Sequence, residues 1–98
     1  MRDDLYASKA RPVVIVQSDE VAGFDSVVLC LFTTFDNAAA PTRVRVEPSV
    51  QNGLSKTSFV MTDKIASVSR DMLGKRIGVL EDAYMDAVSC SLRIVLGL

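Results

Sequence analysis

Histidine and tryptophan are both absent from the 98-residue chain. Without an imidazole, the chain lacks the Ser–His and Cys–His pairs of most nucleophilic enzymes and any imidazole-rich metal centre. The two cysteines, Cys30 and Cys90, lie far apart inside apolar runs, which excludes C-x-x-C spacing and predicts two buried free thiols. Any chemistry must therefore use Arg, Lys, Asp, Glu, Thr, Ser or Tyr, and we expect no metal or other cofactor.

The chain also lacks an excess of charge of one sign and a long hydrophobic run. Eleven Lys and Arg face twelve Asp and Glu, so the formal charge is -1 and no overall positive field attracts polyanions. The longest apolar run, Val27 to Phe32, is far shorter than the roughly 18 residues that cross a bilayer, and the N-terminus has no secretory apolar core. We expect a cytoplasmic protein without membrane contact, in which any nucleic-acid site is local.

The composition that is present is typical of one folded domain, which we expect to cover residues 1–98. Apolar residues make up 49% and charged residues 23% of the chain. A domain of this size buries only roughly two-thirds of its unfolded surface, so a second subunit would stabilise it. The closing letters IVLGL are more apolar than one solvated helix face requires, and they fit either a second copy or the chain's own barrel.

Short runs of β-branched and alternating residues, separated by turn residues, indicate a sheet. Strands are predicted at residues 12–17, 27–33, 42–47, 58–67 and 76–79. In residues 58–67, we expect Phe59, Met61 and Ile65 to point inward. Residues Asn52 and Gly53 have the composition of a turn.

Two helical segments are predicted after these strands. Ser69 can cap a single helical turn that runs through Leu73 and stops at Gly74. From Asp82 to Leu96, apolar residues recur at helical spacing, namely Tyr84, Val88, Leu92 and Val95. This order of elements predicts a mainly β fold with a C-terminal helix, arranged as a small, mostly antiparallel barrel.

Four motifs in a fixed order carry a family resemblance. They are RPVVIVQSD from Arg11, LCLFTT ending at Thr34, NGL, and SFVMTDKIASVSRDMLGKRIGVL ending at Leu80. Across residues 10–97 this pattern resembles the MazF/PemK toxins of bacterial toxin–antitoxin pairs. The resemblance implies an SH3-like barrel that forms a homodimer. It also implies a metal-independent endoribonuclease that cuts single-stranded RNA, commonly mRNA, at short sequences and has an antitoxin as its partner.

The resemblance assigns catalysis to Arg11 and Thr33. RNA can be cut without metal when its own 2′-hydroxyl attacks the neighbouring phosphorus, which leaves a 2′,3′-cyclic phosphate and a 5′-hydroxyl. A guanidinium such as that of Arg11 already carries its proton at neutral pH and is a poor general base. It is suited to stabilise the extra negative charge of the phosphorane. Thr33 can donate a hydrogen bond to a phosphate oxygen or orient the 2′-hydroxyl.

Three further residues are expected to bind the substrate: Thr34, Asp63 and Lys64. Asp63 matches a position that is acidic in several relatives, and it could accept the 2′-hydroxyl proton. The alternative is that Thr33 and Thr34 are β-formers before a turn and that Asp63 and Lys64 form a solvated bulge.

The chain also departs from the family. Relatives usually begin with a strand that contains a Gly-Asp pair and then a longer loop, whereas only MRDDLYASKA precedes Arg11 here. Either Asp4 to Ala7 form a shortened first strand, or the strand and loop are missing and a sheet edge is exposed. Two other functions therefore stay open: a non-catalytic barrel that binds RNA or protein, and a CcdB-like gyrase poison, although that branch depends on a tryptophan.

Overall fold

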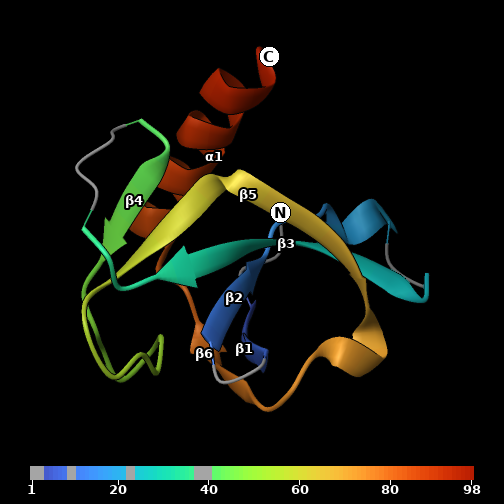
Figure 1. Ribbon diagram of the computed structural model, residues 1–98, viewed down its shortest axis with the longest axis horizontal. Helices are drawn as coiled ribbons and strands as arrows, with labels where there is room; N and C mark the ends of the chain where they lie inside the picture. Colours follow the sequence, from blue (N-terminus) through green and yellow to red (C-terminus); the bar gives the residue numbers. More distant parts are fainter. Residues whose placement is uncertain (1–3, 9–10, 22–23, 37–40) are drawn as a thin grey trace.

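A computed structural model describes residues 4–8, 11–21, 24–36 and 41–98. Six antiparallel strands form one sheet in the order β4-β5-β3-β2-β1-β6, which curls into an open barrel with the helix α1 across β4 and β5 (Figure 1). The strands are β1 (Asp4–Ser8), β2 (Arg11–Ile15), β3 (Ser26–Thr33), β4 (Arg43–Val46), β5 (Ser58–Ser69) and β6 (Arg76–Val79), with 3-10 turns η1 (Asp19–Val21) and η2 (Arg70–Met72) and helix α1 (Asp82–Leu96). The predicted mainly β fold with a C-terminal helix is confirmed.

The first strand is present. β1 pairs with β2 on one side and β6 on the other, so it is an interior strand of the sheet and leaves no edge open at this position. Its connection to β2 consists of residues 9 and 10, which lie outside the described residues. Of the two sequence-based alternatives, the structure therefore selects the short first strand.

The sheet has an apolar cluster on each face. Along β2, Val14 joins the main core beneath α1, while its neighbours Val13 and Ile15 join a smaller cluster on the opposite face with Val27 and Leu29. Successive side chains of a strand point to opposite faces, so this strand is buried on both sides. This double burial explains why the sequence of β2 is continuously apolar instead of alternating.

The inward face of β5 differs from the prediction. Phe59 is buried as expected, but Val60 and Thr62 are both fully buried, whereas Met61 is half-buried and Ile65 is 37% exposed. The prediction is therefore wrong for Ile65, and it overlooked the two most deeply buried positions of the strand.

A β-bulge explains this difference. Leu31 of β3 pairs with Met61, but the preceding residue Cys30 pairs with Ile65. Residues 62–64 of β5 are therefore extra residues between two neighbouring pairs. Extra residues in one strand change which face the following side chains occupy. The alternation that begins at residue 58 therefore does not continue past residue 62.

The predicted helical turn exists, although its ends differ from the prediction. Ser69 makes no side-chain capping hydrogen bond, and η2 is closed by Leu73. Gly74 allows the chain after η2 to approach β1 closely. Its N–H donates to the Ala7 carbonyl oxygen at 2.6 Å, and a Cβ at this position would lie 2.8 Å from the same oxygen. A larger residue at position 74 would push η2 away from β1.

Helix α1 has the predicted bounds and ends at Gly97, whose φ of 71° is accessible to glycine at little cost. Val88 is buried with Met85 and Ser91, and the other predicted apolar positions of the inner face are half-buried. The helix has 15 residues, and no helix in the described part of the chain is long and apolar enough to cross a membrane.

The last apolar residues do not pack on the chain's own barrel. Ile94, Leu96 and Leu98 are 61%, 55% and 87% exposed. Of the two alternatives for the closing letters, docking onto the same subunit is therefore wrong for these three side chains.

The two cysteines have different environments. Cys30 is a buried free thiol, and burial together with a smaller effect of the Asp63 carboxylate raises its pKa to about 11, so it stays protonated at neutral pH. Cys90 is exposed, which corrects the prediction of a second buried thiol. The reason is that Cys90 lies on the outer face of α1, next to the inward-facing Ser91.

Asn52 closes the barrel between β4 and β6. Its Oδ1 accepts the N–H groups of Ser49 and Leu54, both at 3.0 Å, and its Nδ2 donates to the carbonyl oxygen of Glu47 and to Glu81 Oε1. The side chain is fully buried with all of these polar atoms paired. This network sets the path of the chain into residues 54–58.

Gly53 and Gly78 allow the loop around Asn52 to lie against β6. Gly53 has a φ of 72°, and a Cβ there would lie 2.0 Å from the Ile77 carbonyl oxygen. A Cβ on Gly78 would meet the carbonyl oxygens of Gln51 and Asn52 at 2.5 Å. Only glycine fits at both positions, so the predicted turn at residues 52 and 53 is also a packing contact.

Candidate active site

The register between β2 and β3 brings the two predicted catalytic residues together. Val13 pairs with Leu31, and the pairing continues towards Ile15 in the antiparallel sense. The same register, continued past this last pair, directs Arg11 towards Thr33. Because β2 begins at Arg11 and the antiparallel β3 ends at Thr33, both residues lie at the same end of the sheet.

Pro12 explains why the sheet opens at this point. The N–H of Val16 donates to the Val28 carbonyl oxygen at 3.0 Å, in the same register. N–H groups of alternate residues point to the same neighbouring strand, so position 12 would also donate towards β3, opposite Phe32. Proline has no N–H, and the ladder between β2 and β3 ends at Val13. An arginine followed by a proline therefore places the cation just beyond the last hydrogen-bonded pair.

A pocket of about 430 Å³ lies at this end of the barrel. It is within the range of about 300–1,000 Å³ that is common for ligand sites. Its described lining residues are Arg11, Pro12, Phe32, Thr33, Thr34, Phe35, Leu54, Ser55, Lys56 and Ser58. Three predicted site residues, Arg11, Thr33 and Thr34, thus share one pocket.

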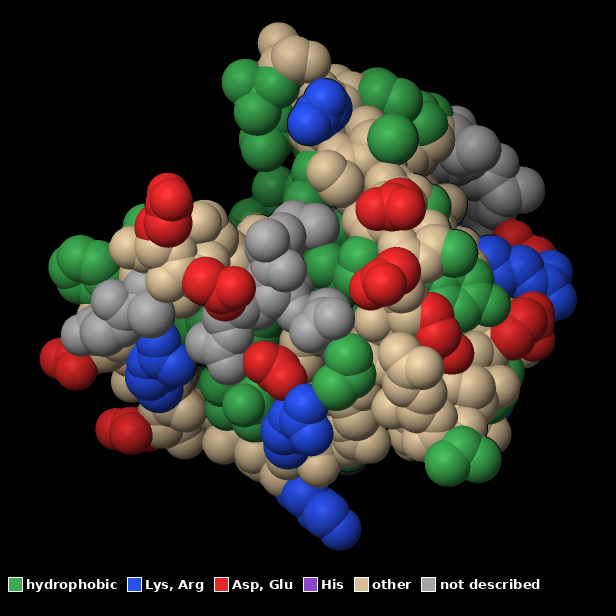
Figure 2. Space-filling view, turned by 180° about the vertical axis from the view of Figure 1, so that it is seen from behind, with side chains coloured by type: hydrophobic (Ala, Val, Ile, Leu, Met, Phe, Trp, Pro, Cys, Tyr) green, Lys and Arg blue, Asp and Glu red, His purple; other side chains and the backbone are tan. Residues whose placement is uncertain are grey.

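The charge of this pocket is positive. Its described lining residues include two cations, Arg11 and Lys56, and no carboxylate. By contrast, acidic and basic side chains are interspersed over the face of the molecule drawn in Figure 2. A chain with a net charge of -1 therefore carries a local site suited to an anion such as phosphate.

The functional groups of Arg11 and Thr33 are available for a ligand. Arg11 is exposed, and within the described ranges its guanidinium has neither a hydrogen bond nor an ion pair. The side-chain oxygen of Thr33 accepts a hydrogen bond from the Phe35 N–H at 3.1 Å. Because this bond uses a lone pair of the oxygen, the Thr33 O–H remains able to donate.

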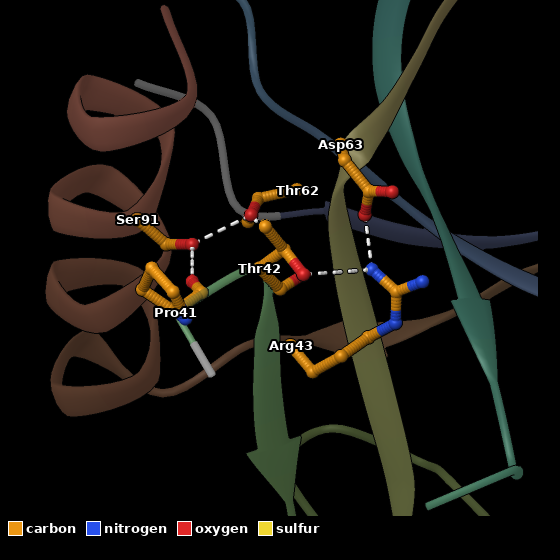
Figure 3. Close-up of polar contacts among 6 residues, drawn as sticks. All are labelled: Pro41, Thr42, Arg43, Thr62, Asp63 and Ser91. Atoms are coloured by element: carbon orange, nitrogen blue, oxygen red, sulfur yellow. Dashed lines mark hydrogen bonds and ion pairs between the residues drawn. The ribbon is translucent and has the colours of Figure 1, made fainter. Parts of the chain in front are cut away.

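Asp63 and Lys64 do not line the pocket. Both belong to the bulge of β5, opposite residues 30 and 31 of β3 and before the strand end at Thr33. Asp63 forms an ion pair with Arg43, whose Nη1 also donates to the Thr42 carbonyl oxygen at 3.1 Å (Figure 3). Asp63 and Lys64 therefore lie on the bulge and outside the described lining of the pocket, and that they bind the substrate stays a prediction.

The same bulge anchors α1. The hydroxyls of Thr62 and Ser91 lie 2.6 Å apart, and Ser91 also donates to the Pro41 carbonyl oxygen (Figure 3). Thr62 N–H donates to the Thr42 carbonyl oxygen at 3.0 Å. The inward half of the bulge thus holds the helix, and the outward half holds Arg43.

Sequence reasoning missed two residues of the pocket, Phe35 and Lys56. Phe35 follows the Thr-Thr pair in an otherwise polar segment, which is a detectable signal because phenylalanine is uncommon there. Lys56 lies 22 residues beyond Thr34, and no sequence pattern links the two; only the path set by Asn52 brings it to the pocket. Among the described residues, no group of three or more His, Cys, Asp or Glu could hold a metal ion.

Known proteins resemble this chain over most of its length. Residues 4–96 match the family model of the PemK-like, MazF-like toxin of type II toxin–antitoxin systems. The probable endoribonuclease MazF of Mycolicibacterium smegmatis is 39% identical over 93 residues, which cover 95% of this chain and 85% of that protein.

Solved structures show the same fold. An endoribonuclease from a mycobacterial species has a TM-score of 0.86 at 29% identity, over 100% of this chain and 91% of that one. A mycobacterial endoribonuclease in complex with its cognate antitoxin also has a TM-score of 0.86, at 28% identity over 100% of this chain and 95% of that one. The chain belongs to the PemK-like, MazF-like family of toxins of type II toxin–antitoxin systems.

Proposed function

We propose that this chain is a toxin endoribonuclease that cuts single-stranded RNA, including mRNA, in the pocket between Arg11 and Thr33. One observation carries the proposal: a guanidinium that is unpaired within the described residues and a strand-end hydroxyl line the same pocket, whose described lining has no carboxylate. Membership in a family whose named relatives are endoribonucleases supports this activity over a gyrase poison or a non-catalytic module.

The proposed reaction uses the RNA's own nucleophile. The 2′-oxygen forms a bond to the adjacent phosphorus and loses its proton, and the bond from phosphorus to the 5′-oxygen breaks. The 5′-oxygen takes up a proton, so the products are a 2′,3′-cyclic phosphate and a 5′-hydroxyl. Neither a metal nor an oxidant enters this balance.

Arg11 and Thr33 stabilise the charge that develops on the phosphorane. The guanidinium presents donors in a planar fork that matches two phosphate oxygens. The Thr33 O–H donates to a third oxygen or to the 2′-oxygen. Preorganised donors of this kind each contribute about a hundredfold to a thousandfold in rate.

Thr34 and Lys56 hold the substrate beside the reacting phosphate. Both are exposed on the pocket lining, and Lys56 has no ion pair within the described residues. Contacts of this kind with the backbone position an RNA strand without reading its sequence. We assign no direct contact with the reacting phosphate to Asp63 or Lys64.

The toxin acts in the cytoplasm as a homodimer that a cognate antitoxin inhibits. The mycobacterial relative in complex with its antitoxin supports the second partner. The exposed apolar end of α1, made of Ile94, Leu96 and Leu98, supports the dimer, because burying these side chains would stabilise a small domain. Replacing Ile94 and Leu98 with aspartate is expected to shift the sedimentation coefficient towards that of a monomer.

RNA cleavage in the presence of a chelator tests the function. Purified protein, incubated with a heteropolymeric single-stranded transcript and excess EDTA, is expected to yield fragments with 2′,3′-cyclic phosphate and 5′-hydroxyl ends. Arg11→Ala should abolish the cleavage, whereas Lys75→Ala, which removes an exposed cation outside the pocket, should not. Intact RNA with the wild-type protein, or equal cleavage by Arg11→Ala, contradicts the proposal.

A further inference from the structure

We propose that Phe35 is a base-stacking residue, which binds the nucleobase of a nucleotide next to the cleaved phosphate. The inference rests on the ribonuclease function proposed above. It assigns to this side chain a part in RNA affinity and in the choice of cleavage site, separate from the charge stabilisation by Arg11 and Thr33.

Phe35 follows the end of β3 and is far more exposed than the phenylalanines within the strands. Its side chain is 69% exposed, whereas Phe32 and Phe59 are 1% and 7% exposed. Single exposed apolar residues are common on protein surfaces, so exposure by itself indicates no ligand. Phe24, for example, is 65% exposed and does not line the pocket.

Phe35 differs from Phe24 in its surroundings. It lines the pocket together with both cations, Arg11 and Lys56, and with the hydroxyl of Thr33. Single-stranded RNA is bound by this combination of groups, in which cations hold phosphates and an aromatic ring stacks on an unpaired base. At 69% exposure the phenyl ring gains little from folding, but a ring beside cations and hydroxyls matches the alternating chemistry of a nucleotide.

The backbone of Phe35 is held in relation to the proposed catalytic hydroxyl. The 3.1 Å hydrogen bond from its N–H to the Thr33 side-chain oxygen closes a tight turn at the end of β3. The phenyl ring is therefore attached two residues beyond Thr33, whose hydroxyl is proposed to contact the phosphate. A base attached to a neighbouring sugar can reach this ring while the phosphate lies between Arg11 and Thr33.

The test measures RNA affinity and cleavage separately. Cleavage sites are first mapped on the heteropolymeric transcript with the wild-type protein. The binding probe is then a short fluorescent RNA around one such site, with a 2′-deoxy sugar at the cleaved position so that the nucleophile is missing. The dissociation constant comes from anisotropy, and kcat and KM come from the cleavable all-ribose version.

Four variants separate stacking from other effects. Phe35→Ala is expected to weaken binding of the probe by about tenfold to a hundredfold, the range for loss of one base stack, with the effect on KM larger than that on kcat. Phe35→Leu should lose nearly as much because it is apolar but not aromatic, while Phe35→Tyr should keep the affinity. Phe24→Ala removes an equally exposed phenyl ring outside the pocket and should bind like the wild type.

Abasic probes then identify the contact. Each probe lacks one base. One of these probes is expected to bind the wild-type protein weakly, and Phe35→Ala is expected to lower the affinity for that probe no further. Additive losses at every position would overturn the inference, as would a Phe35→Ala protein that binds and cleaves like the wild type. If the wild-type protein cleaves no RNA, the proposed function fails instead, so the two failures are distinguishable.

Discussion

The side-chain oxygen of Thr33 accepts a hydrogen bond from the backbone N–H of Phe35, over 3.1 Å. This bond connects the end of β3 to the first residues of the segment that follows. One residue therefore both shapes the wall of the pocket and presents a hydroxyl group to it. Both roles depend on the hydroxyl, so a substitution that removes it should remove both, whereas serine should keep both.

Thr33→Val should lower the cleavage rate about a hundredfold, because valine keeps the shape of threonine but provides neither the acceptor for Phe35 nor the donor for phosphate. Thr33→Ser should retain most of the rate. Single-turnover kinetics at saturating RNA provides the measurement. Equal rates for the valine and serine variants would show that the hydroxyl has no part in the reaction.

Arg11→Lys should also lose about a hundredfold to a thousandfold in kcat, because an ammonium group keeps the charge but not the planar fork of donors. The melting temperature should hardly change, since Arg11 is exposed and makes no ion pair with any described residue. A large loss of melting temperature would mean that the arginine is structural.

Asn52→Ala should destabilise the protein by about 2 kcal/mol or more. The substitution leaves the buried N–H groups of Ser49 and Leu54 and the carbonyl oxygen of Glu47 without their partner. Urea unfolding is the appropriate measurement. Gln51→Ala is the matched control, because its side chain is exposed and only its backbone oxygen is used, by the Val79 N–H. A similar loss in both variants would contradict the role of the Asn52 side chain.

Glu81 should make stability depend on pH in the acidic range. Partial burial opposes its ionisation, but hydrogen bonds from Ser49, from its own backbone and from Asn52 outweigh that effect and lower the pKa of the carboxyl below its ordinary value of 4.5. A lowered pKa in the folded state means that the stabilisation is complete above about pH 4.5 and is lost as the pH falls through the folded pKa.

The measurement compares the wild type with Glu81→Gln. The difference in free energy of unfolding between the two should be largest at pH 7 and should shrink as the solution is acidified below about pH 4.5. A difference that stays constant from pH 7 to pH 3 would show that the charge of Glu81 makes no contribution.

Asp63→Asn distinguishes a general base from a structural ion pair. The structure predicts a loss of stability of about 1–3 kcal/mol, because Arg43 is 13% exposed and would lose its anionic partner. Cleavage by the protein that remains folded should change less than tenfold. A loss of a hundredfold or more, with the acidic limb of the pH–rate profile removed, would instead make Asp63 the base.

The strands after β1 and the C-terminal helix were predictable because their signals are local. The β-branched run of β2 and the helical spacing from Asp82 to Leu96 each depend on neighbours a few residues apart. The faces of β5 beyond Thr62 were not predictable in the same way. A bulge is defined by its partner strand, and the sequence of residues 58–69 does not state that Cys30 pairs with Ile65 while Leu31 pairs with Met61.

The pocket shows the same division. Arg11 and Thr33 were identified from the family resemblance, whose motifs include the Arg-Pro pair before one apolar strand and the Thr-Thr pair after the next. Phe35 and Lys56 were missed, and Asp63 and Lys64, which were predicted to bind the substrate, do not line the pocket. The residues next to an acidic or basic side chain in the sequence do not show whether that side chain forms an ion pair on a bulge or contacts a ligand.

By itself, the sequence determined which segments form strands and helix, the absence of histidine chemistry, and the arginine and hydroxyl groups available for catalysis. Only the tertiary structure decided which of these groups meet. The antiparallel pairing of β2 and β3 brought Arg11 and Thr33 to the same end of the sheet, and the buried Asn52 network directed Lys56 to the same pocket. The physical reason is that register and loop closure depend on contacts between residues far apart in the chain, and no local pattern records them.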